Sequence, residues 1–192
     1  MSEKLYIGFD LSTVASGYSV FSSNEKLMES GVIVPSASDV TTRIREIATK
    51  TKAVISNVRC KTDKIEVIIE DVYYGSNYLT TKILNRLAGA VIMTAMDLIP
   101  ASSIIFVTPT GARKSMGILP KSTKAQVVKE VNKKFGLDLK LKDNDEADGI
   151  VLGFYGVWKD KNPEMSFTEQ SKKFFKSGMR TPRMRKNNEK KS

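Results

Sequence analysis

Apolar residues recur along the chain in two rhythms, and the shorter rhythm predicts strands. Residues 4–9 and 16–21 are largely apolar and flank the small-residue segment DLSTVAS, so they predict a hairpin. Residues 27–34 extend it as a third strand. Residues 64–71 and 103–109 are short β-branched runs of the kind found in buried parallel strands. The pattern therefore predicts five strands.

The longer rhythm predicts helices, because apolar residues recur at helical spacing in residues 38–58, 77–99, 122–135 and 143–158, with a short helical turn at 110–117. The 77–99 segment is apolar on more than one face, which is typical of a helix buried on two sides. Strands that alternate with helices after an antiparallel meander predict an α/β fold. We expect a five-stranded mixed sheet, an antiparallel meander plus two parallel strands, flanked by helices.

Charge divides the chain into two parts. The 192 residues carry a net charge of +10, and residues 159–192 alone hold 11 basic and 4 acidic residues. We expect one core domain over residues 1–158 and a basic C-terminal extension over 159–192, with one short helix that Ser166 and Glu169 would cap. Such an extension indicates either a polyanionic partner or a solubilising tail.

Missing residue types exclude several kinds of chemistry. The sequence contains no histidine, which excludes Ser-His-Asp and Cys-His nucleophilic catalysis and histidine zinc sites. The single cysteine, Cys60, excludes an intrachain disulfide and fits a reducing compartment. The start of the chain does not resemble a signal peptide, and no apolar run approaches the ~20 residues of a membrane helix. We expect a cytoplasmic protein without membrane contact.

Four acidic residues fall where predicted elements begin or end. Asp10 ends the first strand, Glu70 ends the fourth, and Asp145 and Asp148 lie on one face at the start of the last helix. Taken singly, each is more readily explained as a structural residue, such as a helix-start acid or an ion-pair partner. If all four converge, their repulsion requires divalent cations, and oxygen ligands favour Mg²⁺. Asp143 and Glu146 predict a capping box for that helix.

Three acidic motifs in this order resemble those of the RuvC-type Holliday junction resolvases, which have an RNase H-like nuclease fold. IGFDLSTVASGYSVF resembles their first motif, VIIEDVYYGSN the second and DNDEADGIVLG the last. ARKSMGILPKSTKAQVVKEV resembles the basic stretch before the last helix. The resemblance covers residues 4–158, and each motif alone is weak.

The resemblance implies a Mg²⁺-dependent endonuclease that cuts branched DNA as a homodimer, with the 77–99 helix in the dimer interface. We expect Mn²⁺ to substitute for Mg²⁺, and cleavage to leave 5′-phosphate and 3′-hydroxyl ends. Carried over by position, the metal ligands and catalytic carboxylates would be Asp10, Glu70, Asp145 and Asp148. Lys124, as the catalytic cation, and Arg113 would face the scissile phosphate or the DNA backbone, and Lys121 and Lys114 are near alternatives. Tyr73 would be the aromatic residue at the junction, or an ordinary core or surface tyrosine.

The chain departs from the family pattern at its first motif. Bacterial members usually read Asp-Pro-Gly where this sequence reads Asp10-Leu11-Ser12, and the segment 73–78 is also unlike theirs. This divergence is similar to that of phage-encoded members, which act in the host cytoplasm. The sequence leaves open whether a branch-migration motor takes part.

Three other functions compete with a resolvase. GFDLSTVASG also resembles the first phosphate loop of actin-like ATPases and sugar kinases, but those folds need a second domain and a Gly-rich second loop, which this sequence lacks. A non-catalytic module that binds branched DNA would keep the acids as structural residues. An RNase H acting on RNA–DNA hybrids would share the fold and the acids.

Overall fold

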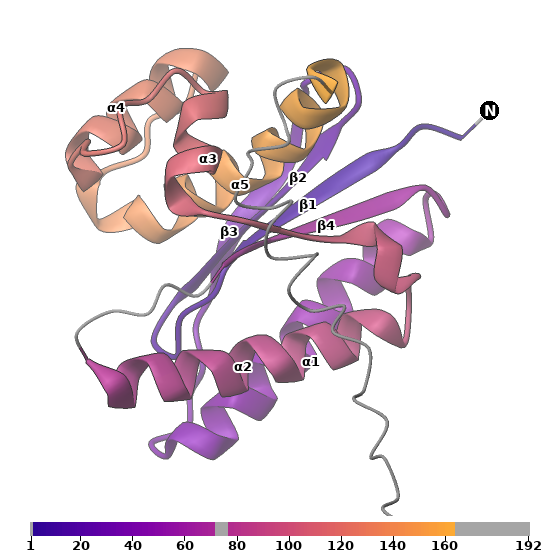
Figure 1. The fold of residues 1–192 in the computed structure, drawn as a ribbon, viewed down its shortest axis with the longest axis vertical. Helices are drawn as coiled ribbons and strands as arrows, with labels where there is room; N and C mark the ends of the chain where they lie inside the picture. Colours follow the sequence, from indigo (N-terminus) through magenta and orange to yellow (C-terminus); the bar gives the residue numbers. More distant parts are fainter. Residues whose placement is uncertain (1, 72–76, 164–192) are drawn as a thin grey trace, which may run out of the picture. The chain divides into compact units, whose positions relative to one another are not determined.

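The computed structural model describes residues 2–71 and 77–163, and its fold is the expected α/β arrangement (Figure 1). The chain divides into two units, Met1–Lys161 and Asn162–Ser192, and the elements of the fold belong to the first. The short helix expected in the extension lies outside the described residues. The elements are β1 (Leu5–Asp10), β2 (Ser16–Ser22), β3 (Leu27–Ile33), α1 (Val40–Arg59), β4 (Ile65–Glu70), α2 (Tyr78–Met96), η1 (Ala101–Ser103), β5 (Ile104–Val107), α3 (Pro109–Ser115), α4 (Lys124–Phe135), η2 (Leu141–Asp143) and α5 (Asn144–Lys161).

The five strands form one mixed sheet in the order β3-β2-β1-β4-β5. The pairs β1–β2 and β2–β3 are antiparallel, while β4 adds parallel to β1 and β5 adds parallel to β4. The predicted meander with two parallel additions is therefore confirmed. Parallel pairing brings the carboxyl ends of β1 and β4 to the same edge of the sheet, since Phe9 pairs with Ile69.

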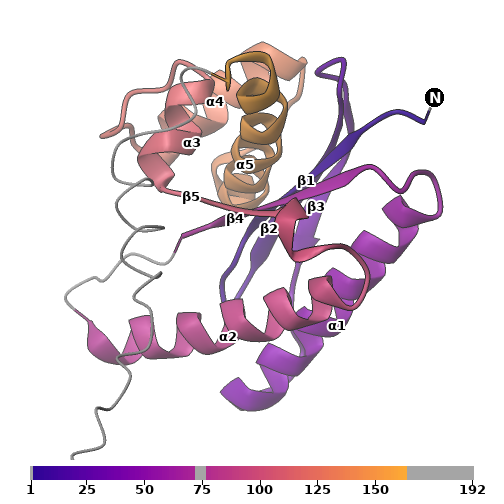
Figure 2. The same ribbon diagram turned by 45° about the vertical axis from the view of Figure 1, so that its right-hand side comes forward.

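Helices cover both faces of the sheet (Figure 2). One core lies between the sheet and the pair α1 and α2, and it includes Ile7, Phe9 and Ile69. The other lies between the sheet and α3, α4 and α5, and it includes Tyr6 and Ile68. Successive strand residues point to opposite faces. Asp10 on β1 and Glu70 on β4 therefore share the α5 face with Tyr6 and Ile68.

Helix α5 approaches β1 and β2 closely because glycines line the contact. A Cβ atom on Gly8 would lie 2.1 Å from the backbone nitrogen of Gly153, and one on Gly17 would lie 1.7 Å from the carbonyl oxygen of Asp145. The Ser19 hydroxyl donates to the carbonyl oxygen of Gly149 at 2.8 Å. No residue larger than glycine fits at Gly8 or Gly17 without a backbone shift, so these contacts fix where α5 begins.

The predicted capping box at the start of α5 is wrong. The Asp143 carboxylate instead accepts from the backbone N–H of Lys140 at 2.8 Å, within the turn η2. The Glu146 carboxylate accepts from the Ser30 hydroxyl at 2.6 Å. A partner on β3, 116 positions away in the sequence, thus replaces the local one.

Candidate active site

The structure places the four predicted carboxylates at one edge of the sheet. Asp10 and Glu70 are the last residues of two neighbouring parallel strands, β1 and β4. Asp145 and Asp148 lie in the first two turns of α5, the helix that packs on β1 and β2. Gly17 faces both groups, since it pairs with Asp10 across the β1–β2 ladder and touches the backbone of Asp145.

Burial and the negative charges of neighbouring carboxylates raise the pKa values of Asp10, Glu70 and Asp148. The pKa of Asp10 rises to about 8, first because of burial and then because of the negative charges of Glu70, Asp148 and Asp145. The pKa of Glu70 rises to about 7, again through burial first and then through Asp148. Burial also raises the pKa of Asp148. The cluster therefore has too little positive charge around it to keep every carboxylate ionised.

Among the residues that the structure describes, two cations act on this cluster, and Lys124 is the first. It begins α4, and its ammonium donates to the side-chain oxygen of Asn144 and lies 3.8 Å from a carboxylate oxygen of Asp145. Its charge opposes the rise in pKa at Asp10 and Asp148. The sequence reasoning did not foresee the role of Asn144, because only the fold brings the start of α4 to the start of α5.

Arg113 on α3 is the second cation, and its guanidinium is engaged with the chain itself. Its Nη1 donates to the carbonyl oxygens of Pro120 at 3.1 Å and Ser122 at 3.2 Å. Its charge also opposes the rise in pKa at Glu70 and Asp148. Arg113 thus holds the loop between α3 and α4 beside the carboxylates.

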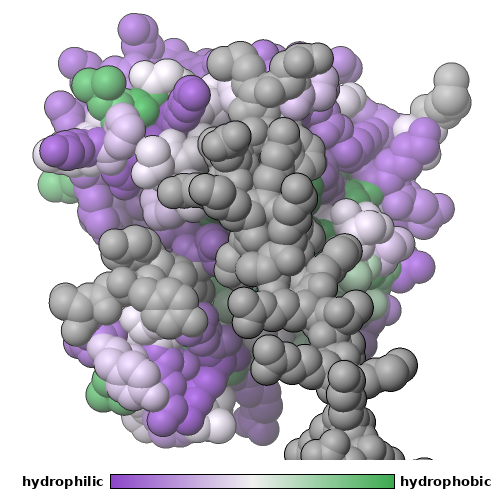
Figure 3. All heavy atoms as spheres, in the orientation of Figure 1, coloured by the Kyte–Doolittle hydropathy of each residue, from purple (hydrophilic) through white to green (hydrophobic). Residues whose placement is uncertain are grey.

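The remaining predicted contacts differ in how much the structure says of them. Lys114 and Lys121 are exposed on α3 and on the loop before α4. The side of the molecule formed by α3 and α4 has a largely hydrophilic surface (Figure 3). Further exposed lysines on this side are Lys129, Lys133, Lys134, Lys140 and Lys142. Tyr73 lies outside the described residues.

The donor set fits a hard divalent cation. Among residues 2–71 and 77–163, no three or more Asp, Glu, His or Cys side chains are arranged as a ready-made metal site, so binding requires the carboxylates to reorient. The raised pKa values of Asp10 and Glu70 show where added positive charge would be stabilising. Carboxylate oxygens without nitrogen or sulfur ligands favour ions such as Mg²⁺.

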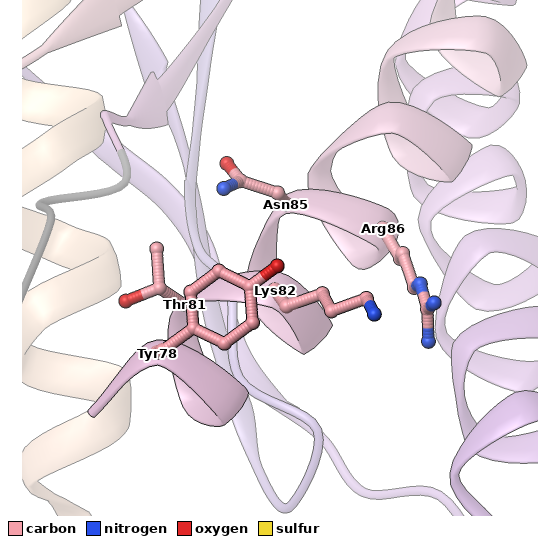
Figure 4. Close-up of a pocket in the computed structure, with 5 residues that line it drawn as sticks. All are labelled: Tyr78, Thr81, Lys82, Asn85 and Arg86. Atoms are coloured by element: carbon pink, nitrogen blue, oxygen red, sulfur yellow. The ribbon is translucent and has the colours of Figure 1, made fainter.

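A hollow on α2 lies apart from the carboxylates. It is lined by Tyr78, Thr81, Lys82, Asn85 and Arg86, all from the first half of that helix (Figure 4). No predicted site residue lines it.

A five-stranded mixed sheet with helices on both faces, and acids at the ends of β1 and β4 and at the start of α5, is typical of the RNase H-like fold. The family model for the crossover junction endodeoxyribonuclease RuvC matches residues 6–154. The chain therefore belongs to the RuvC family of endodeoxyribonucleases. In the part that the structure describes, no helix is long and apolar enough to cross a membrane.

One curated protein of the same family and several solved structures of the same fold are similar to this chain. A crossover junction endodeoxyribonuclease RuvC from Chloroherpeton thalassium (strain ATCC 35110 / GB-78) is 26% identical over 174 residues, which are 87% of this chain and 89% of that protein. Thermus thermophilus RuvC has a TM-score of 0.66 at 15% identity, over 83% of this chain and 96% of that one. Its complex with a Holliday junction substrate gives the same TM-score and identity, over 85% and 97%. The yeast mitochondrial Holliday junction resolvase Ydc2 has a TM-score of 0.57 at 15% identity, over 90% and 85%.

Proposed function

We propose that this protein is a Mg²⁺-dependent resolvase that cuts Holliday junctions and related branched DNA by two-metal-ion hydrolysis of phosphodiester bonds. The observation that carries the proposal is the cluster of Asp10, Glu70 and Asp148 at the shared edge of β1 and β4, with pKa values raised by burial and by one another. The family assignment and the likeness to a RuvC bound to a Holliday junction substrate support the substrate class.

The residues that would hold the ions are Asp10, Glu70, Asp145 and Asp148, and Mn²⁺ is expected to replace Mg²⁺ there. Bound Mg²⁺ would supply an activated water and would neutralise charge that develops on the phosphate. Asp10 must give up its proton to become a ligand, because its pKa of about 8 keeps it largely protonated at neutral pH before the ion binds. The chain contributes the position of the backbone, because β1, β4 and α5 would bring the ligands to one place from three elements.

Lysine and arginine side chains of the protein would bind the DNA backbone. Lys124, whose ammonium already lies 3.8 Å from Asp145, would stabilise charge on the scissile phosphate. Arg113 would act through the α3–α4 loop that it holds, and so would place Lys121. Lys114 is expected to contact backbone phosphate, and Tyr73 is expected to stack at the branch point.

Two copies of the chain would cut the two strands of a junction. The exposed face of the second half of α2 carries Met93 and Met96, with fractional exposures of 64% and 46%. Gly89 leaves open space beside them. An apolar ridge with a glycine gap suits close helix packing in a two-fold dimer. The nuclease activity would reside in residues 1–158, while the basic extension over 159–192 would add salt-dependent affinity for DNA. The departure at Leu11-Ser12 supports a phage-encoded member.

The test is cleavage of a labelled mobile four-way DNA junction in Mg²⁺ and in EDTA, by wild type and by Asp10→Asn. We expect paired symmetric nicks that need both Mg²⁺ and Asp10, with junction binding retained in the variant. Binding without any cutting by wild type would favour a non-catalytic module. Cutting of RNA–DNA hybrids alone would favour an RNase H. Cleavage by Asp10→Asn at the wild-type rate would refute the site.

A further inference from the structure

The outward face of α2 has two unlike halves. Residues four apart follow one another along it, because four residues make slightly more than one helical turn. Tyr78, Lys82 and Arg86 occupy the first half and surround the hollow in Figure 4. Gly89 and the methionines Met93 and Met96, all exposed, continue the same face in the second half. One face therefore changes from cationic to apolar at Gly89.

The cations of the first half are available to a ligand. Lys82 and Arg86 are exposed, and within the described part of the chain neither has an acidic side chain at ion-pair distance. Helix α2 contains no acidic residue at all. The ammonium of Lys82 lies 5.9 Å from the ring centre of Tyr78, which is itself 77% exposed. The ring thus supports the cation at the surface without neutralising it.

This half of α2 also follows the candidate active site in the chain. Glu70 ends β4, and Tyr78 begins α2 eight residues later. From Tyr78 to Arg86 the helix advances by about 12 Å, the rise of three to four base pairs of duplex DNA. A duplex arm that runs along this face would thus meet several backbone phosphates.

A second copy of the chain is a poor partner for this half. Two-fold packing of α2 on its copy would set these cations against the partner's cations or against its methionines, and either arrangement leaves them unpaired. Apposed like charges and desolvated lone cations are both unfavourable. The apolar half beyond Gly89 suits such packing, whereas the cationic half suits a polyanion.

We propose that Tyr78, Lys82 and Arg86 form a phosphate-binding surface for a duplex arm of the branched substrate. It would act without reading base sequence, because its cations would meet the backbone rather than base edges. The inference rests on the proposed function.

The test measures equilibrium binding of a fluorescent four-way DNA junction in EDTA over a range of salt concentrations. It compares wild type, Lys82→Gln/Arg86→Gln and the control Arg45→Gln, which removes an exposed cation from α1. Log affinity falls with log salt, and each lost phosphate contact makes this dependence shallower by about 0.9 in the magnitude of its slope. We expect the magnitude of the slope to fall by about 2 in the double variant and to stay unchanged in Arg45→Gln. Sedimentation velocity should show the wild-type oligomer in all three proteins.

Equal slopes for the double variant and wild type would overturn the inference while the proposed function stands. A double variant that loses the wild-type oligomer would also overturn it, by assigning the face to a second copy. Failure of wild type itself to bind or cut the junction would instead contradict the proposed function.

Discussion

Strand β4 carries a glutamate at each end of the same face, and the two ends are opposites in charge balance. Glu66 and Glu70 are four residues apart, so both point toward α5. Glu66 lies against the ammonium groups of Lys159 and of Lys4, the latter at 2.8 Å. Glu70 lies among carboxylates, with the charge of Arg113 as partial compensation.

The groups around the two glutamates differ in the same way. At the Glu66 end, the Asp160 carboxylate accepts from Lys4 at 2.6 Å and from the Tyr6 hydroxyl at 2.8 Å. Burial opposes ionisation of Asp160, but these hydrogen bonds prevail and lower its pKa. At the other end, the start of α5 adds two more acids, Asp145 and Asp148. Helix α5 thus brings a lysine to one glutamate and carboxylates to the other.

This difference separates stability from chemistry within one strand. A buried carboxylate with fitted cations stabilises the fold only while its partners remain. A buried carboxylate without them destabilises the chain until an external cation arrives. The chain itself supplies the cations at the Glu66 end, whereas the Glu70 end would need the proposed metal ion.

The sharpest way to break the comparison is the same substitution at both ends. Glu70→Gln removes a proposed metal ligand, so we expect cleavage to fall by about 10³-fold or more, the equivalent of about 4 kcal/mol. Glu66→Gln should leave cleavage per folded molecule unchanged. It should lower the free energy of unfolding by about 2 kcal/mol, less than for a fully buried pair because Lys4 and Lys159 keep part of their hydration. Junction cleavage and urea unfolding measure the two effects.

Each variant is a control for the other, because both replace a glutamate by a glutamine of the same size and remove one negative charge. Parallel losses of cleavage in both would mean that the whole strand, rather than one end, supports the chemistry. A Glu70→Gln protein that cuts at the wild-type rate would remove Glu70 from the site.

Two glycines on the α5 contact sharpen the comparison further. A Cβ on Gly17 would meet the Asp145 carbonyl oxygen at 1.7 Å, so Gly17→Ala must move the start of α5. A shift of about 1 Å in catalytic groups costs about 10²-fold in rate. A Cβ on Gly156 would meet only side-chain atoms, Ile68 Cδ1 at 2.5 Å and Tyr6 Cδ1 at 2.8 Å. Gly156→Ala should therefore cost about 1–3 kcal/mol of stability and spare the chemistry.

Cleavage rates corrected for the folded fraction, together with the rise in melting temperature on adding Mg²⁺, distinguish these outcomes. We expect Gly17→Ala to lose most of the Mg²⁺-induced rise and Gly156→Ala to keep it. A similar loss in both variants would show that Gly17 acts on stability alone.

The comparison also shows what the sequence can reveal. The strand ends at Asp10 and Glu70 were predictable, because each acid closes a short apolar run whose neighbours fix its place in a parallel sheet. The Glu66 network was not predicted, since Lys159 lies 93 positions away and becomes a partner only when α5 packs across the sheet. The capping box predicted for Glu146 was wrong for the same reason, because its partner Ser30 lies on a distant strand. Local patterns define elements and their ends, whereas pairings across the core depend on the fold.

The last expected effect concerns how the free energy of unfolding depends on pH when no metal ion is present. The folded pKa values of Asp10 and Glu70, about 8 and about 7, exceed their ordinary values of 3.8 and 4.5, so the folded chain binds more protons than the unfolded chain between these limits. The free energy of unfolding should therefore fall as pH rises from 6 to 8.5 in EDTA. Asp160 has the opposite sign, but its lowered pKa confines its contribution to pH values below its ordinary 3.8.

Urea unfolding at pH 6 and pH 8.5 measures this slope at the Glu70 end alone. Asp10→Asn/Glu70→Gln should flatten it, because neither replacement titrates, and should leave the metal-free protein more stable than wild type at pH 8.5. Added Mg²⁺ should reverse the wild-type slope, since the ion binds the deprotonated carboxylates and favours high pH. A wild-type slope that stays flat in EDTA would mean that these carboxyls are solvated in solution. The contrast between the two ends of β4 would then rest on Glu66 alone.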